Sequence, residues 1–100
     1  MNYDAYIKSA NRGDFQWEVV EYNDDGGVDV ETCTYKGESI DASITKISNN
    51  EYEVEIDWLS NEPSYIVQTR SSRKFARELA ERIIRNDKEG NWEKNLKYAV

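Results

Sequence analysis

The stretch FQWEVVEYNDDGGVDVETCTY, residues 15–35, contains the pattern that decides the fold. Its first eight and last eight residues tend to alternate between apolar and polar side chains, which is typical of β-strands with one face on a core. Between them lies Asp25-Gly26, a strong signal for a type I′ hairpin turn, because both central residues of that turn need positive φ. The stretch therefore predicts an antiparallel pair of strands.

The length of the loop between these strands decides which side chains share a face of the sheet. With Asp25-Gly26 as a two-residue loop, Trp17 faces Thr34, and Glu18 lies on the other face with Glu31 and Asp29. We therefore expect the acidic residues of both strands to gather on the outer face of the sheet.

The same alternation continues toward residue 59. After the turn Lys36-Gly37-Glu38, the run SIDASITKI predicts a third strand, and Asn49-Asn50 leads into a fourth, EYEVEIDWL. The acids of the fourth strand join the face of Glu18 only if the two later turns have three-residue or bulged loops. Toward the N-terminus, Asn2 is placed to cap a short helix, whose apolar residues recur at helical spacing up to residue 10.

The C-terminal third has helical periodicity. The run YIVQT, residues 65–69, fits either a short strand or the lead-in to a helix. From Ser72, which is placed to cap a helix, an apolar stripe extends to about residue 85. The last ten residues, NWEKNLKYAV, predict a short final helix that docks through Trp92 and Leu96.

These elements predict one domain, residues 1–100, of the α+β class. It has a short N-terminal helix, a four-stranded antiparallel β-meander, a C-terminal helix packed on one sheet face and a short final helix. The expected core consists of Trp17, Val19, Val30, Ile44, Val54, Ile56 and Trp58, together with Phe75, Leu79 and Ile83.

The composition argues against catalysis. The chain has no His, which excludes Ser-His and Cys-His nucleophile pairs and most zinc sites. Cys33 is the single cysteine, and the five glycines form no phosphate-binding loop. We therefore expect a non-enzymatic protein without cofactor or metal. The chain has no signal-peptide pattern and no run of about 20 apolar residues, so we expect a cytoplasmic protein without membrane contact.

Charge is the strongest functional signal. Residues 1–69 hold four basic against 15 acidic residues, a net charge of −11, whereas residues 70–100 hold nine basic and five acidic residues. Like charges on neighbouring strands destabilise a sheet, and few lysines are interspersed among them. We therefore expect a partner-binding strip that attracts a basic nucleic-acid-handling protein or nucleoprotein complex. Its expected members are Glu18, Asp29, Glu31, Glu53, Glu55 and Asp57.

The element order, the acidic meander with DDGG and EYEVEIDWL, and the terminal helix resemble the small phage anti-CRISPR and anti-restriction inhibitors. The resemblance spans the whole chain but rests on size, charge and element order. It implies a phage-encoded protein of the host cytoplasm that blocks a nucleic-acid-binding surface. Acidic immunity proteins that neutralise nuclease toxins fit the same features.

A second resemblance points to a different function. Residues 69–84, TRSSRKFARELAERII, are similar to the last helix of double-stranded-RNA-binding domains, in which basic residues contact phosphates. On this alternative the helix 72–85 would bind nucleic acid through Arg73, Lys74 and Arg77. The acidic body opposes that function, so we expect direct nucleic-acid binding to be weak.

Overall fold

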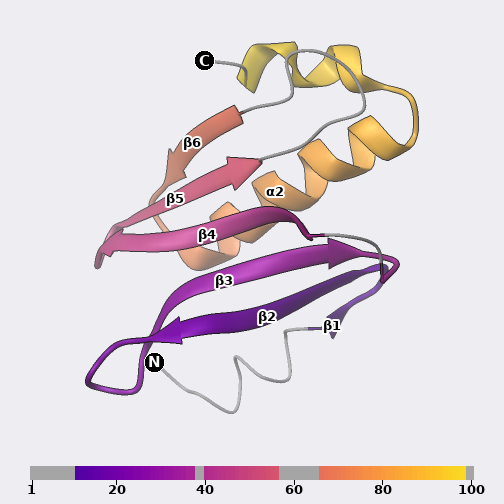
Figure 1. Ribbon diagram of the computed structural model, residues 1–100. Helices are drawn as coiled ribbons and strands as arrows, with labels where there is room; N and C mark the ends of the chain where they lie inside the picture. Colours follow the sequence, from indigo (N-terminus) through magenta and orange to yellow (C-terminus); the bar gives the residue numbers. More distant parts are fainter. Residues whose placement is uncertain (1–10, 38–39, 57–65, 99–100) are drawn as a thin grey trace.

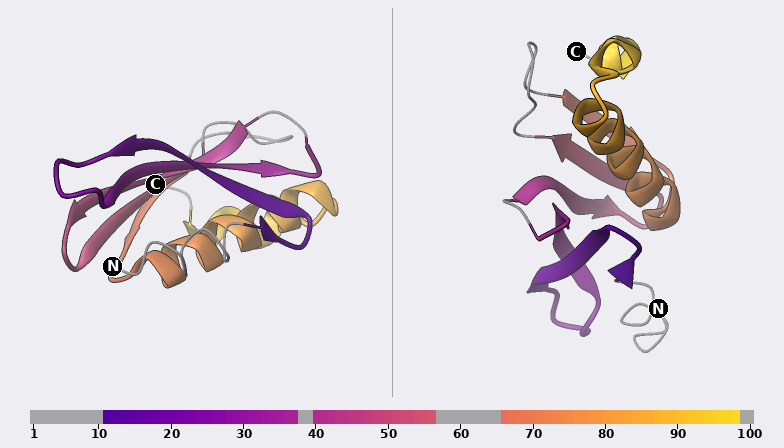
Figure 2. Two further views of the ribbon diagram at one scale, coloured as in Figure 1. Left: turned by 90° about the horizontal axis from the view of Figure 1, so that it is seen from below. Right: turned by 90° about the vertical axis from the view of Figure 1, so that its right-hand side faces the viewer.

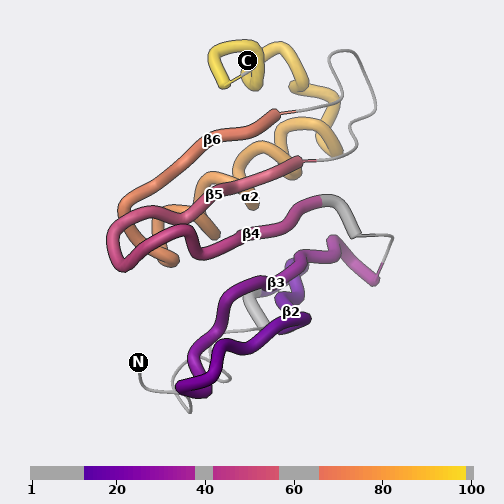
Figure 3. Tube along the Cα trace, turned by 60° about the vertical axis from the view of Figure 1, so that its left-hand side comes forward, coloured from indigo at the N-terminus to yellow at the C-terminus, as the bar shows by residue number. Residues whose placement is uncertain are grey.

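A computed structural model describes residues 11–37, 40–56 and 66–98 as an antiparallel sheet with one long helix across one face (Figure 1). The strand order is β1-β2-β3-β4-β5-β6, so each strand lies beside the next one along the chain (Figure 3). The elements are β1 (Asn11–Arg12), β2 (Phe15–Tyr22), β3 (Val28–Tyr35), β4 (Ile40–Ser48), β5 (Glu51–Ile56), β6 (Ile66–Arg70), the α-helix α2 (Arg73–Lys88) and the 3₁₀ helix η1 (Trp92–Tyr98).

The α+β class is confirmed, but the sheet is larger than the predicted four-stranded meander. Residues 66–69 of the run that fitted either a strand or a helix lead-in belong to β6, a fifth long strand, which pairs with β5. At the opposite edge β1 adds two residues beside β2. The predicted N-terminal helix lies outside the described residues.

The hairpin between β2 and β3 is built around the side chain of Asn23. Its amide oxygen accepts hydrogen bonds from the backbone N–H of Asp25 at 3.0 Å and of Gly27 at 2.9 Å. Its backbone N–H donates to the Gly27 carbonyl at 2.9 Å, and Gly26 takes the positive φ of 80° that this loop requires. The chain between the strands is therefore Asn23 to Gly27, not the predicted two-residue loop.

This longer loop moves the register of β3 by one residue. Trp17 pairs with Cys33, not with Thr34, and Val19 pairs with Glu31. Because successive side chains point to opposite faces, a slip of one residue exchanges the two faces of a strand. Glu31 is therefore on the helix side of the sheet, and its predicted place on the outer face is wrong.

The β4–β5 hairpin meets the condition for a shared acidic face. The register shifts between Lys46 and Ser48, which leaves Ile47 as an extra residue before the turn at 49–50. As a result Ser43 pairs with Glu55, and Ser43 also pairs with Thr32 of β3 on its other side. Glu55 thus lies on the same face as Glu18.

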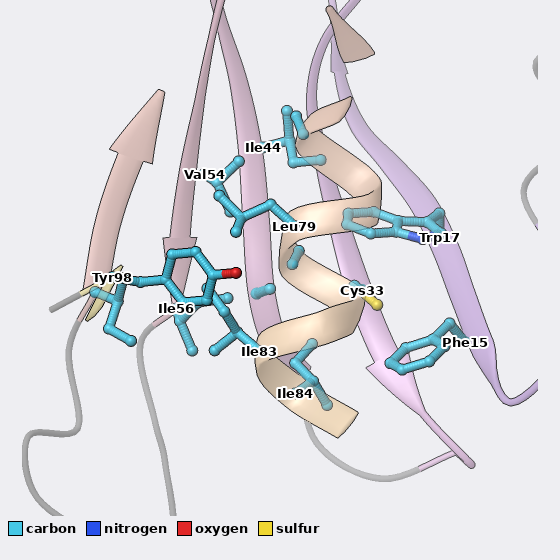
Figure 4. Close-up of a cluster of buried hydrophobic side chains, with 14 residues drawn as sticks. Phe15, Trp17, Cys33, Ile44, Val54, Ile56, Leu79, Ile83, Ile84 and Tyr98 are labelled. Carbon is cyan, nitrogen blue, oxygen red and sulfur yellow. The ribbon is translucent and has the colours of Figure 1, made fainter. Parts of the chain in front are cut away.

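The core lies between the sheet and α2 (Figure 2). In Figure 4, Phe15, Trp17 and Cys33 lie to one side of the helix, with Ile56 and Tyr98 to the other. The buried apolar residues are Phe15, Trp17, Val28, Cys33, Ala42, Ile44, Val54, Ile56, Ile66, Ala76, Leu79, Ala80, Ile83, Ile84 and Tyr98.

Most of the predicted core is confirmed, and the exceptions have physical reasons. Phe75 is 51% exposed because it lies off the helical stripe that contains Ala76 and Leu79. Val30 pairs with Thr45 on the face away from the helix, and Val19 is only half-buried. Trp58 lies outside the described residues.

Helix α2 begins as predicted, with the Ser72 hydroxyl accepting a hydrogen bond from the Phe75 N–H at 3.2 Å. The final helix docks differently from expectation. Its buried residues are Asn95 and Tyr98, whereas Leu96 is exposed and Trp92 half-buried. Asn95 donates to the carbonyl of Ile83 at 3.0 Å. Within the described ranges, neither helix has the length and apolar character needed to cross a bilayer.

Tyr98 should ionise at lower pH than an ordinary tyrosine. The Arg82 guanidinium donates to the Tyr98 hydroxyl at 3.3 Å, and this hydrogen bond lowers the pKa of Tyr98 because it favours the phenolate, although burial acts in the opposite direction. A pH titration of ¹³C-labelled tyrosines by NMR should resolve this shift among the seven tyrosines. Arg82→Met should return the pKa toward about 10, whereas Arg85→Met should not change it. An unchanged Tyr98 titration in Arg82→Met would contradict this assignment.

Candidate docking face

The structure brings together only part of the predicted acidic strip. Glu18, Glu53 and Glu55 share the face of the sheet that α2 does not cover. Asp29 lies at an irregularity of the β2–β3 pairing, where it accepts a hydrogen bond from the Asn23 amide at 3.3 Å. Glu31 is buried on the opposite face, and Asp57 lies outside the described residues.

Two rows of paired residues run across this uncovered side, which we call the open face. The pairing of Glu21 with Val30, between two register shifts of β2, places this acid on the open face as well, although it was not predicted to belong to the strip. Within these two rows there is no Lys or Arg. The first row is Glu18, Thr32, Ser43, Glu55 and Val67, and the second is Glu21, Val30, Thr45, Glu53 and Thr69.

The open face combines short side chains with carboxylates. Its central positions on β3 and β4 are Thr, Ser and Val, which suit a pleated surface without long side chains. Ser43 donates a hydrogen bond to Glu55 at 3.5 Å, so one carboxylate is oriented by its neighbour. The longer side chains of these rows on β2 and β5 are carboxylates, and Glu18 and Glu21 are exposed. The face therefore presents negative charge around hydroxyl groups.

The fully buried Glu31 forms an ion-pair network with α2. Arg77 donates to both of its oxygens, from Nε at 3.2 Å and from Nη2 at 3.0 Å. Arg73 donates from Nη1 to Glu31 at 2.8 Å and from Nη2 to the Val28 carbonyl at 2.7 Å. Two-pronged arginine–carboxylate pairs are strong and directional. This network fixes the helix against β3.

Aromatic rings enclose the same network. The Arg77 guanidinium lies 5.6 Å from the centre of the Trp17 ring, and Arg73 lies 5.1 Å from that of Tyr52. Trp17 donates its indole N–H to Glu81 at 2.9 Å. The polar side chains between β3 and α2 are thus held by partners within the fold.

These contacts correct the alternative nucleic-acid site. Arg77 is buried, and the side chain of Arg73 is 13% exposed, with both bound to Glu31. Lys74 is exposed and remains accessible. Of the three side chains predicted to contact phosphate, only Lys74 is therefore open to solvent, and Arg73 and Arg77 are bound to Glu31.

A pocket of about 590 Å³ lies at the end of the sheet near the Asn23 loop. Lys46, Tyr52 and Arg73 line one part of it, and the loop residues Asp25 and Gly26 line another. The lining residues of this pocket were not predicted to meet, because the pocket depends on the five-residue loop. Its ionic groups are of both signs, and one of them, Arg73, is bound to Glu31.

The thiol and the possible metal ligands of the described residues do not form a further site. Cys33 is fully buried, and its thiol lies 3.7 Å from the Thr34 carbonyl. No cluster of three carboxylate or thiol side chains with metal-binding geometry occurs among the described residues. No family model, curated protein or solved structure was found to match the chain.

Replacing Glu31 should weaken the fold strongly. Glu31→Gln leaves Arg77 and Arg73 facing a neutral amide in a buried site, and the loss of one partner of such a pair typically costs about 3–5 kcal/mol. Urea unfolding followed by circular dichroism measures the change. Glu53→Gln on the open face is the matched control and should alter the free energy of unfolding by less than about 0.5 kcal/mol. Equal midpoints for the two variants would show that the network contributes little.

Nucleic-acid binding should be weak. At physiological salt, gel shifts with duplex RNA should show no affinity tighter than the non-specific range of about 10⁻⁴ to 10⁻⁶ M, because Arg73 and Arg77 are held by Glu31. The exposed Lys74 is the suitable test position, since replacing Arg73 would also disturb the fold. Tight, salt-sensitive binding that Lys74→Gln reduces would reinstate the helix as a nucleic-acid site.

Proposed function

We propose that this protein is a non-enzymatic inhibitor that binds a basic surface of a nucleic-acid-handling protein through its open face. The observation that carries the proposal is the segregation of charge on the sheet. Two complete rows of cross-strand pairs hold four carboxylates and neither lysine nor arginine. An ordinary soluble surface mixes both signs.

The physical chemistry of such a face favours this kind of partner. Alternate residues on a strand are about 7 Å apart and strands about 4.8 Å apart, so Glu53 and Glu55 present regularly spaced anions. Basic grooves that accept a polyanion attract such a surface over distances near the Debye length. The face thus supports competition with nucleic acid for the same groove.

The resemblance to acidic phage inhibitors adds to the proposal. On this proposal the protein is either a phage-encoded anti-defence protein that acts in the host cytoplasm or an immunity protein that neutralises a nuclease toxin. Both require the same binding chemistry and differ in the target. The alternative of a nucleic-acid-binding module has less support, because two of its three basic residues are bound to Glu31.

The test removes charge from the open face without disturbing the core. A triple variant carries Glu18→Gln, Glu53→Gln and Glu55→Gln, and a matched control carries Glu78→Gln, Glu89→Gln and Glu93→Gln in the helical part. Both raise the net charge by the same amount. In affinity capture from a host lysate at increasing salt, followed by binding assays with the captured protein, only the open-face variant should lose capture and inhibition.

The outcomes separate the hypotheses. Capture of a nuclease or nucleoprotein that weakens with salt, and that the control variant retains, supports the inhibitor. Recovery of nucleic acid alone supports the binding-module alternative. Unchanged capture by the open-face variant would show that this face is ordinary solvent-exposed surface.

A further inference from the structure

We infer that the part of the partner bound by the open face is an α-helix with basic residues along both flanks. This inference rests on the proposed function and specifies the shape of the partner. It starts from the way in which acids and short side chains are distributed over the strands. Acids occupy β2 and β5, whereas the two strands between them carry only short side chains in the same rows.

We call this arrangement of side chains a trough, because two acidic rims flank a floor of short side chains. One rim consists of Glu18 and Glu21 on β2, and the other consists of Glu53 and Glu55 on β5. The floor between the rims consists of Val30, Thr32, Ser43 and Thr45, all half-buried. Glutamate side chains extend further from the sheet than these residues, so the carboxylates flank the floor.

The width of the trough matches a helix. The rims are three strand spacings apart, about 14 Å, and an α-helix with its side chains has a diameter of about 10–12 Å. A helix lying along the floor would bring its two flanks to the two rims. The same sheet already packs α2 along its other side (Figure 2).

The chemistry of the trough specifies the residues of that helix. Short Thr, Ser and Val side chains allow close approach of a helix face made of small residues. Carboxylates on both rims select Lys or Arg on both flanks, as at the e and g positions beside a coiled-coil seam. A helix with bases on one flank only would place positive charge beside one rim alone.

The test uses three synthetic peptides of equal length and charge. The first is a stapled helix with Ala along one face and Arg on both flanks. In the second stapled helix the Arg residues are moved to the face opposite Ala. In the third, proline prevents helix formation. Titrations into ¹⁵N-labelled protein, followed by NMR at low salt, give both affinity and the residues contacted.

The flanked helix should bind at least about tenfold tighter than the other two peptides, as expected when several weak ion pairs add. Its shift changes should cover Thr32, Ser43 and Thr45. Glu18→Gln with Glu21→Gln, and Glu53→Gln with Glu55→Gln, should each weaken binding, whereas Glu89→Gln with Glu93→Gln should not.

Two other outcomes overturn the inference. Equal binding of all three peptides on the open face would exclude a helix requirement, while the dependence on the rim acids would still support the proposed function. Binding elsewhere, or none on this face, would exclude the helix partner. The capture experiment with the Glu18, Glu53 and Glu55 variant would then decide the proposed function independently.

Discussion

The side-chain oxygen of Asn23 is the constraint on which the rest of the structure depends. By accepting hydrogen bonds from two loop amides it closes a five-residue connection and sets the register of β3 against β2. That register turns Glu31 toward the helix. A buried carboxylate needs positively charged or hydrogen-bonding partners, and α2 supplies them with Arg77 and Arg73.

The buried ion pair specifies geometry more than it adds stability. Well-packed apolar side chains often hold two elements together as well as a buried salt bridge does. The two-pronged contact between Arg77 and Glu31 has a fixed direction, however, and Trp17 joins it through Glu81 on the same helix. These contacts fix the rotation of α2 about its axis.

Local patterns predicted the elements, and non-local contacts decided their details. Alternation and the Ser72 cap were enough to predict β2 to β5 and the helix. The face of Glu31 was not predictable, because a dipeptide with strong hairpin propensity was overridden by the Asn23 side chain two residues earlier. Of the candidate site, Glu18, Glu53 and Glu55 were predicted to share a face only if the later turns were bulged, and the register shift at Ile47 is such a bulge. Arg73 and Arg77 were assigned to solvent because their partner was assigned to the wrong side.

The segregation of charge also gives the molecule a direction in an electric field. The open face carries four carboxylates, and residues 73–98 on the other side hold eight basic and five acidic residues. This separation of charge contributes a dipole component perpendicular to the sheet. Such a dipole exerts a torque before contact, so that an approaching cationic surface meets the acidic side first. Rotational search, which limits most protein associations, is thereby shortened for one orientation.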